Sequence, residues 1–165
     1  MTIRSLPARP ATAYGGEMRP VTTDDAANVI FNFSGGDLVA ATGATASASM
    51  SFVEAGEPVH RLEIFGERGA LRVEGGGELW HAPVGAGAWR RVEIGSTPLA
   101  PGMQDTGWSR GFTRFAQEIV RALVAGRVSV EDAATFTDGH RTQLVLDAAR
   151  RSHASGSWAT PEAAT

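Results

Sequence analysis

The sequence predicts an α+β fold, with an open, mostly antiparallel β-sheet and two main helices packed on one face. Three observations lead to this prediction. Apolar and polar residues alternate in several short stretches between residues 28 and 94, glycine-rich turns separate these stretches, and two later stretches carry apolar residues at helical spacings. Strands followed by helices are typical of this class. With 165 residues, 42% of them hydrophobic, the chain is long enough for one domain with a sizeable core.

The domain organisation is expected to be simple. Residues 1–20 contain Pro7, Pro10 and Pro20 and show little apolar periodicity, so they are expected to form an extended or disordered lead-in. The folded domain is expected over residues 21–161, and residues 162–165 would then be a short tail.

The first two expected strands form a hairpin. One strand covers residues 28–33, and the turn Ser34–Asp37 contains a Gly-Gly pair, which tolerates the positive φ angles of a tight turn. The return strand has two contrasting faces, one apolar (Ala44, Ala46, Ala48, Met50, Phe52) and one hydroxyl-rich (Thr45, Ser47, Ser49, Ser51). Because these residues are small, we expect a flat hydroxyl-rich surface on one side and a closely approaching layer on the other.

Four more strands are expected after this hairpin. They cover residues 60–65, 70–73, 78–81 and 89–94, and the turns between the first three lie at Gly66–Gly69 and Gly75–Gly77. The result is an antiparallel meander of five or six strands.

Two helices follow a loop at residues 95–107. The first carries an apolar stripe (Phe112, Phe115, Ala116, Ile119, Val120, Leu123), and Gly126 is well placed to end it. The second is expected to begin at Ser129–Asp132, where a serine oxygen can cap backbone N–H groups, and to end near Gly156. Its inward residues are expected to be Ala133, Phe136, His140, Leu144, Val145, Ala148 and Ala149.

Composition argues against several classes of protein. The net charge is −3 with no basic run, so nucleic acid is not an expected partner. The absence of cysteine excludes disulfides, thiolate metal sites and cysteine nucleophiles, and it fits a reducing compartment. No signal-peptide pattern and no apolar stretch of about 18 residues is found, so we expect a cytoplasmic protein with no membrane contact.

The common catalytic and ligand-binding patterns are also missing. There is no G-x-G-x-x-G phosphate loop and no G-x-S-x-G nucleophile elbow, and hairpin turns explain the glycines better. The four histidines lack the spacing of metal ligands. The acidic pairs Asp24–Asp25 and Glu131–Asp132 are explained by capping at the start of regular elements. His140, beside Asp138, is either a hydrogen-bonded core histidine or a proton donor facing a cleft, and core packing is favoured.

One loop gathers side chains suited to binding a sugar or a carboxylate. Within six residues it holds an acid (Asp105), an indole (Trp108) and an arginine (Arg110). The alternative is an ordinary linker between sheet and helix, with Trp108 packed against the core. Loops carry function often enough that the residues alone leave these two interpretations about equal.

Three segments share their order and spacing with a known family. They are Phe65–Leu71 (FGERGAL), Phe112–Ile119 and Asp138–Ser152, within a series from about Val21 to Pro161. Together they resemble the C-terminal domain of the Gfo/Idh/MocA oxidoreductases. The resemblance implies that the exposed sheet face pairs with another subunit, giving a homodimer. It also implies that peripheral substrate contacts come from the loop matching Asp105–Arg110.

The same resemblance implies NAD(P), a separate N-terminal Rossmann half and a catalytic lysine. All 15 basic residues here are arginines, and the dinucleotide motif is missing. The chain is therefore expected to be the substrate-binding and oligomerisation domain of an oxidoreductase acting on sugars or polyols, either truncated or split from its Rossmann partner. By itself it should bind no NAD(P) and supply no catalytic residue. Two alternatives remain, a non-enzymatic binding or scaffold module that uses the sheet face and a small α+β hydrolase built on Asp138 and His140.

Overall fold

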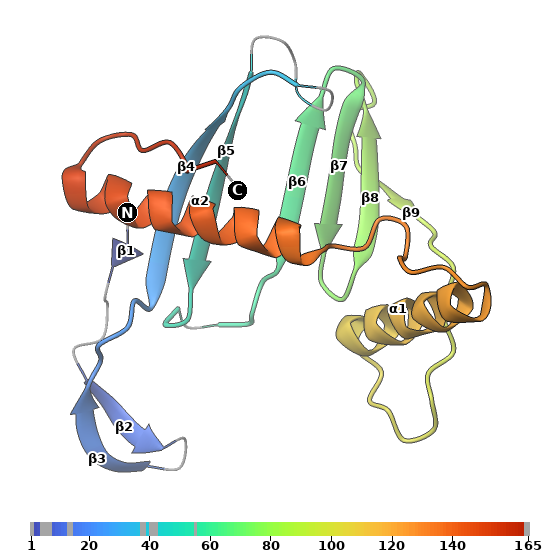
Figure 1. Ribbon diagram of the computed structural model, residues 1–165, viewed down its shortest axis with the longest axis horizontal. Helices are drawn as coiled ribbons and strands as arrows, with labels where there is room; N and C mark the ends of the chain where they lie inside the picture. Colours follow the sequence, from blue (N-terminus) through green and yellow to red (C-terminus); the bar gives the residue numbers. More distant parts are fainter. Residues whose placement is uncertain are drawn as a thin grey trace. The chain divides into compact units, whose positions relative to one another are not determined.

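The structure of the chain is a computed structural model, in which residues 2–3, 8–12, 15–36, 39, 43–54 and 56–163 are described. The chain divides into two compact units (Figure 1). The first comprises residues 1–56 and 134–165, and the second comprises residues 57–133. The elements are open antiparallel sheets and two helices, which confirms the predicted α+β class.

The first unit contains a three-stranded antiparallel sheet in the order β1-β4-β5. Its strands are β1 (Thr2–Ile3), β4 (Ala26–Phe33) and β5 (Ala44–Ser51). The register pairs Val29 with Ala48 and Ile30 with Ser47, so the apolar and hydroxyl-rich faces are the predicted ones. Val29 and Ala48 are half-buried, whereas Ile30 and Ser47 are exposed. The apolar face is covered around Val29 and Ala48, whereas Ala44, Ala46 and Met50 on the same face are exposed.

The return strand β5 starts at Ala44, as predicted. In the connection from β4, Gly36 and Val39 exchange backbone hydrogen bonds. Asp37, at the end of the predicted turn, lies outside the described residues.

A separate hairpin precedes β4. It consists of β2 (Ala8–Thr12) and β3 (Gly15–Pro20), which pair only with each other within the described residues. Residues 1–20, expected as an extended or disordered lead-in, thus hold three short strands. The prolines and the weak apolar periodicity gave no strand signal, but each strand of a two-stranded sheet has an open edge, where the missing N–H of a proline leaves no ladder hydrogen bond unmade.

The second unit contains a four-stranded meander in the order β6-β7-β8-β9. Its strands are β6 (Arg61–Gly66), β7 (Gly69–Glu74), β8 (Glu78–Pro83) and β9 (Arg90–Val92). The register gives this sheet one apolar face (Leu62, Ile64, Leu71, Val73, Leu79, Val92) and one charged face (Arg61, Glu63, Arg72, Glu74, Glu78, Trp80, Arg91). The predicted strands and glycine turns are confirmed, but the hydrogen bonding is divided among three sheets instead of one.

Helix α1 (Gly107–Val124) ends as predicted but begins earlier. Its C-cap is Ala125, and Gly126 follows with φ of 68°. The N–H of Arg127 donates to the Ala122 carbonyl and that of Gly126 to the Leu123 carbonyl, so the helix closes with a Schellman motif.

Helix α2 (Phe136–Ser155) begins later than predicted. Its N-cap is Thr135, and Asp138 completes a capping box. Asp132 has φ of 59°, a left-handed conformation that interrupts helical geometry, so Ser129 and the pair Glu131–Asp132 do not open the helix. The predicted end is confirmed by Gly156, which has φ of 66°.

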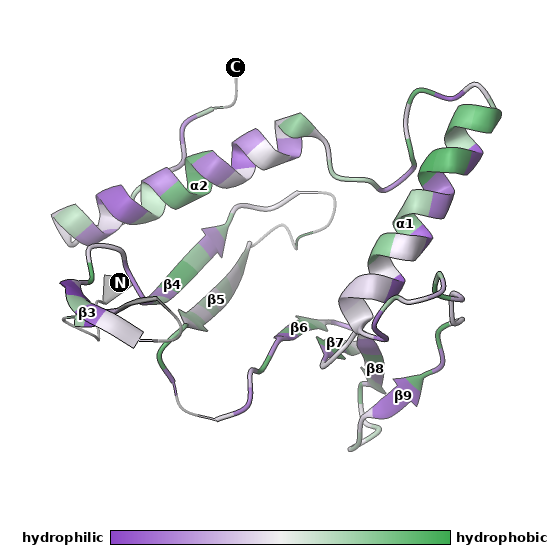
Figure 2. Cartoon of the chain, turned by 90° about the horizontal axis from the view of Figure 1, so that it is seen from below, coloured by the Kyte–Doolittle hydropathy of each residue, from purple (hydrophilic) through white to green (hydrophobic). Residues whose placement is uncertain are grey.

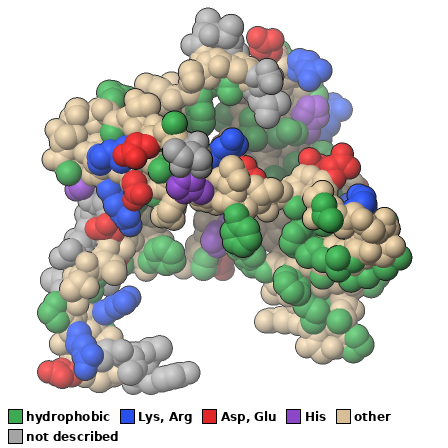
Figure 3. Space-filling view, in the orientation of Figure 1, with side chains coloured by type: hydrophobic (Ala, Val, Ile, Leu, Met, Phe, Trp, Pro, Cys, Tyr) green, Lys and Arg blue, Asp and Glu red, His purple; other side chains and the backbone are tan. Residues whose placement is uncertain are grey.

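Few side chains are deeply buried. Among the described residues they are Val21, Asp25, Ala122 and Ala148. Ala148 was predicted to face inward and does so, but Phe136 and His140 are exposed, against expectation. Helix α1 is strongly amphipathic, as the hydropathy colouring of Figure 2 illustrates. Its apolar stripe is nevertheless largely exposed, and Figure 3 shows hydrophobic side chains gathered on α1.

Candidate functional site

A hollow of about 630 Å³ lies within the second unit. The β7–β8 turn, strand β9 with the segment after it, and the first turns of α1 form its walls. Its charged lining residues are Glu78, Arg91, Glu93, Asp105, Arg110 and Arg114. Two of the predicted substrate-binding residues, Asp105 and Arg110, are therefore placed together in one concave site.

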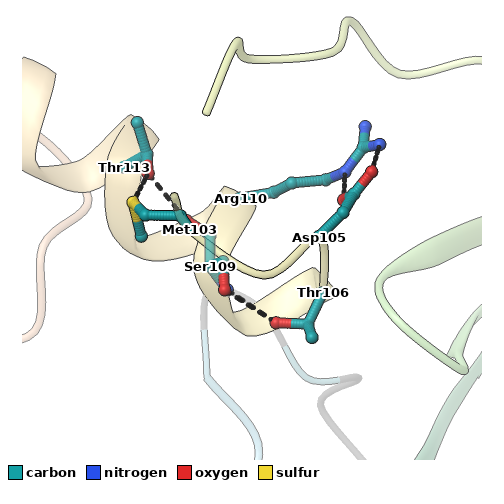
Figure 4. Close-up of polar contacts among 6 residues, drawn as sticks. All are labelled: Met103, Asp105, Thr106, Ser109, Arg110 and Thr113. Atoms are coloured by element: carbon teal, nitrogen blue, oxygen red, sulfur yellow. Dashed lines mark hydrogen bonds and ion pairs between the residues drawn. The ribbon is translucent and has the colours of Figure 1, made fainter. Parts of the chain in front are cut away.

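Asp105 and Arg110 form a two-pronged ion pair. The Arg110 Nε donates to Oδ1 of Asp105 at 2.7 Å, and its second terminal nitrogen donates to Oδ2 at 2.8 Å (Figure 4). This hydrogen bonding lowers the pKa of Asp105 and raises the pKa of Arg110. The two side chains thus hold each other in a fixed geometry, and one terminal nitrogen of Arg110 has no partner among the described residues.

The first turn of α1 positions this pair. Thr106 is the N-cap, and its Oγ1 accepts from the Ser109 N–H at 3.1 Å. The hydroxyl of Thr113 donates to the Ser109 carbonyl at 2.8 Å and lies 3.8 Å from the Met103 sulfur (Figure 4). Arg110 therefore belongs to the helix and not to a loop, which gives its backbone a rigid support.

Glycines allow the helix to start where it does. The backbone of Gly107 approaches that of Gly76 in the β7–β8 turn so closely that a Cβ on Gly107 would overlap the Gly76 carbonyl. This contact joins the end of the hairpin to the start of α1. Sequence reasoning assigned Gly76 to a turn but had no signal for its distant partner.

Trp108 lies apart from the hollow. Its indole is 83% exposed and meets the His60 ring edge-on, with 6.5 Å between ring centroids. It is not among the residues that line the hollow. Successive residues of a helical turn point in different directions, which separates Trp108 from Arg110.

The pair Asp138 and His140 belongs to the first unit, on α2. Asp138 accepts from the Thr135 N–H at 2.9 Å and from its hydroxyl at 2.7 Å. These bonds, helped by the charge of Arg141, lower the pKa of Asp138. His140 makes no ring contact or hydrogen bond within the described part of the chain, so neither residue is arranged there as a base with its nucleophile.

The sequence analysis missed two arginines of the hollow. Arg91 lies 3.3 Å from Glu78 and 3.9 Å from Glu93. Arg114 follows Arg110 by one helical turn and lines the hollow without an ion pair in the described residues. The spacing Arg110-x-x-x-Arg114 was visible in the sequence, but it gains meaning only once the helix is known to begin at Gly107.

The described residues contain no cluster of three histidine or carboxylate side chains able to hold a metal ion. Neither helix in the described ranges has the length and apolar character needed to cross a membrane.

A family model described as the oxidoreductase family, C-terminal alpha/beta domain, matches residues 6–160. The match covers nearly the whole chain. The chain therefore belongs to the Gfo/Idh/MocA oxidoreductase family, as its C-terminal domain. Comparison with curated proteins and with solved structures gave no match.

The described residues do not fit the NAD(P) on which this family depends. A dinucleotide site usually places a glycine-rich turn between a strand and a helix N-terminus. Here 14 residues, 93–106, separate β9 from α1, and α2 follows another helix. At the start of α2 the Asp138 carboxylate already occupies the cap and would repel a pyrophosphate.

Proposed function

We propose that this chain is the substrate-contacting and subunit-associating domain of an NAD(P)-dependent oxidoreductase acting on sugars or polyols. The nucleotide and the acid–base lysine come from a separate Rossmann domain or subunit. The observation that carries the proposal is the paired Asp105 and Arg110 in the hollow of the second unit, within a chain that belongs to this family.

The hollow has the chemistry of a polyol site. Carboxylate oxygens of Asp105 retain lone pairs that accept from sugar hydroxyls, and the remaining N–H groups of Arg110 donate to them. Because the two side chains fix each other, little conformational entropy is lost when a substrate binds. The chain contributes no proton-transfer group of its own, and Asp105 acts by positioning Arg110 as much as by direct contact.

The association role rests on the sheet of the first unit. Thr45, Ser47 and Ser49 lie on one exposed face of β5, opposite Asn32, Ile30 and Asn28 of β4 on the same face. Short side chains leave that face flat, which suits self-complementary contact with a second copy. We propose a homodimer formed through this face.

Complementation tests the substrate role. A Rossmann domain from a family member, supplied in trans or fused, should restore NAD(P)-dependent oxidation of a sugar or polyol. Arg110→Ala should then lower kcat/KM roughly tenfold to a hundredfold, mainly by raising KM, because a charge-assisted contact to the substrate is lost.

A control variant and two alternative outcomes make the result decisive. Arg150→Ala removes an exposed arginine of the first unit that pairs with Asp147, and it should leave the kinetics unchanged. If Arg110→Ala lowers the melting temperature but not kcat/KM, the ion pair is structural and the assignment fails. Specific binding of another protein by the sheet face, with no activity under any complementation, would favour a scaffold module instead.

A further inference from the structure

We infer that the substrate held in this hollow carries an anionic group, a carboxylate or a phosphate, and that Arg114 binds it together with Ser96 and Thr97. The inference rests on the proposed substrate role of the hollow and makes it more specific. It follows from the positions of polar side chains in the hollow that have no hydrogen-bond or ion-pair partner among the described residues.

The hollow adjoins a second one of about 320 Å³ in the same unit. The two share a wall formed by Gly95, Ser96, Thr97 and Arg114. Arg114 projects from α1, and the other three belong to the segment that follows β9. The shared wall therefore brings one helix and one loop together at a single place.

Charge pairing leaves Arg114 as the free cation of this region. Among the arginines that line the two hollows, Arg91 pairs with Glu78, Arg110 with Asp105, and Arg121 with Glu118, whereas Arg114 has no carboxylate within ion-pair distance in the described chain. Glu118, one turn further along α1, is already engaged by Arg121. An anion placed beside Arg114 would displace no existing bond.

The hydroxyls of the shared wall are also free to bind. Within the described residues, the hydroxyls of Ser96 and Thr97 make no hydrogen bond to a side chain or to the backbone. Thr97 is half-buried. One guanidinium and two hydroxyl donors are a set that recognises carboxylate or phosphate oxygens, and the Asp105–Arg110 pair in the same hollow would then bind the neutral hydroxyls of the ligand.

Titration of the full chain, followed by amide NMR shifts, tests this assignment with three probes. Inorganic phosphate and gluconate represent the two anionic groups, and sorbitol is the neutral polyol of matching size. We expect saturable shifts at residues 95–97 and 114 with phosphate, gluconate or both, and these shifts should weaken with added salt. Binding by phosphate alone indicates a sugar phosphate, and binding by gluconate alone indicates a sugar acid.

Variants separate a specific site from general attraction. Arg114→Gln should weaken the affinity for the anion about tenfold or more, and Arg114→Lys should retain most of that affinity. Arg121→Gln should change the affinity less than about twofold. The inference is overturned if no anion binds saturably, if sorbitol binds as tightly as gluconate, or if both glutamine variants weaken binding equally. Sorbitol binding that depends on Arg110, with no saturable binding of either anion, would overturn the anionic site while the proposed function stands. Saturable anion binding without restored activity under complementation would contradict the proposed function while the anionic site stands.

Discussion

At the scale of single residues, two polar clusters outside the hollow are expected to stabilise the fold. Asp138 is held by Thr135 in the capping box that starts α2. Arg72 lies with its guanidinium carbon 5.2 Å from the Trp80 ring centroid and 4.7 Å from that of Trp89. Each cluster makes a measurable prediction.

The capping box predicts an acid-sensitive helix. Because hydrogen bonds from Thr135 lower the pKa of Asp138 in the folded state, its stabilising contribution is fully present above the unfolded pKa of about 4. It is lost as the pH falls through the lower folded value. Asp138→Asn should therefore reduce stability at pH 7, and the difference from wild type should shrink at pH 3, as followed by circular dichroism melts.

Asp147→Asn is the matched control, because Asp147 lies on the same helix and contacts only Arg150 among the described residues. It should show a smaller effect at pH 7. Thr135→Ala removes the other half of the box and should cost about 1 kcal/mol. An Asp138→Asn difference that persists unchanged at pH 3 would contradict the assignment.

Arg72 and its two tryptophans predict unequal mutational costs. Arg72 is largely buried, and its terminal nitrogen lies 3.2 Å from a Glu74 oxygen. Arg72→Met should lower the unfolding free energy by roughly 1–3 kcal/mol through loss of two cation–π contacts. Trp80→Phe should cost less, because the buried Trp80 Nε1 has no hydrogen-bond partner in the described residues. Urea unfolding measures both, and equal costs would show that the indole N–H has an acceptor.

At the scale of elements, the meeting of the β7–β8 turn and α1 governs the candidate site. Gly76 and Gly107 meet backbone to backbone, so this contact fixes where α1 begins and hence where Arg110 and Arg114 lie. The contact joins residues that are far apart in sequence, so no local sequence pattern predicts it.

Gly107→Ala should displace the start of α1, because its Cβ would overlap the Gly76 carbonyl. The expected results are a lower melting temperature and amide shift changes that reach Arg110. Gly111→Ala lies one turn later with open space around its Cβ, so the same change there should stabilise the helix by about 0.5–1 kcal/mol. If Gly107→Ala proves as stabilising as Gly111→Ala, the backbone contact does not exist in solution.

At the scale of the whole molecule, few side chains of the described residues are buried, and we propose that a partner covers part of the exposed apolar surface. Val21, Ala122 and Ala148 are the buried apolar residues in the described ranges, while Phe112 and Ile119 of α1 remain exposed. Stability from burial scales with the apolar area removed from water, so covering further surface should add to it. Association with a second copy or with a Rossmann domain would supply that covering.

The proposed dimer predicts a mass of two chains in light scattering at tens of micromolar. Ser47→Arg with Ser49→Arg should yield monomers, since like charges would face each other across the flat surface of β5. Gln143→Arg with Ala154→Arg adds the same charge at exposed positions of α2 and should leave the dimer intact. A wild-type chain that is monomeric at this concentration would refute the dimer.

The sequence by itself determined what depends on local periodicity and turn chemistry. Alternation along 44–51 fixed the two faces of β5, Gly126 and Gly156 marked the helix ends, and the order of these segments pointed to the family that the profile match then showed. Asp105 and Arg110 were found because they are close in sequence.

Only the tertiary structure decided the starts of both helices, the division of the strands into three sheets, and the convergence of Arg114 with Ser96 and Thr97. A helix start depends on which of several possible residues forms the N-cap. Thr135 forms the N-cap of α2 in place of Ser129, because Asp138 completes a capping box with Thr135. The shared wall of the hollows depends on where the segment after β9 lies against α1. Such contacts are long-range, so their free energy is not encoded in any single stretch of the chain.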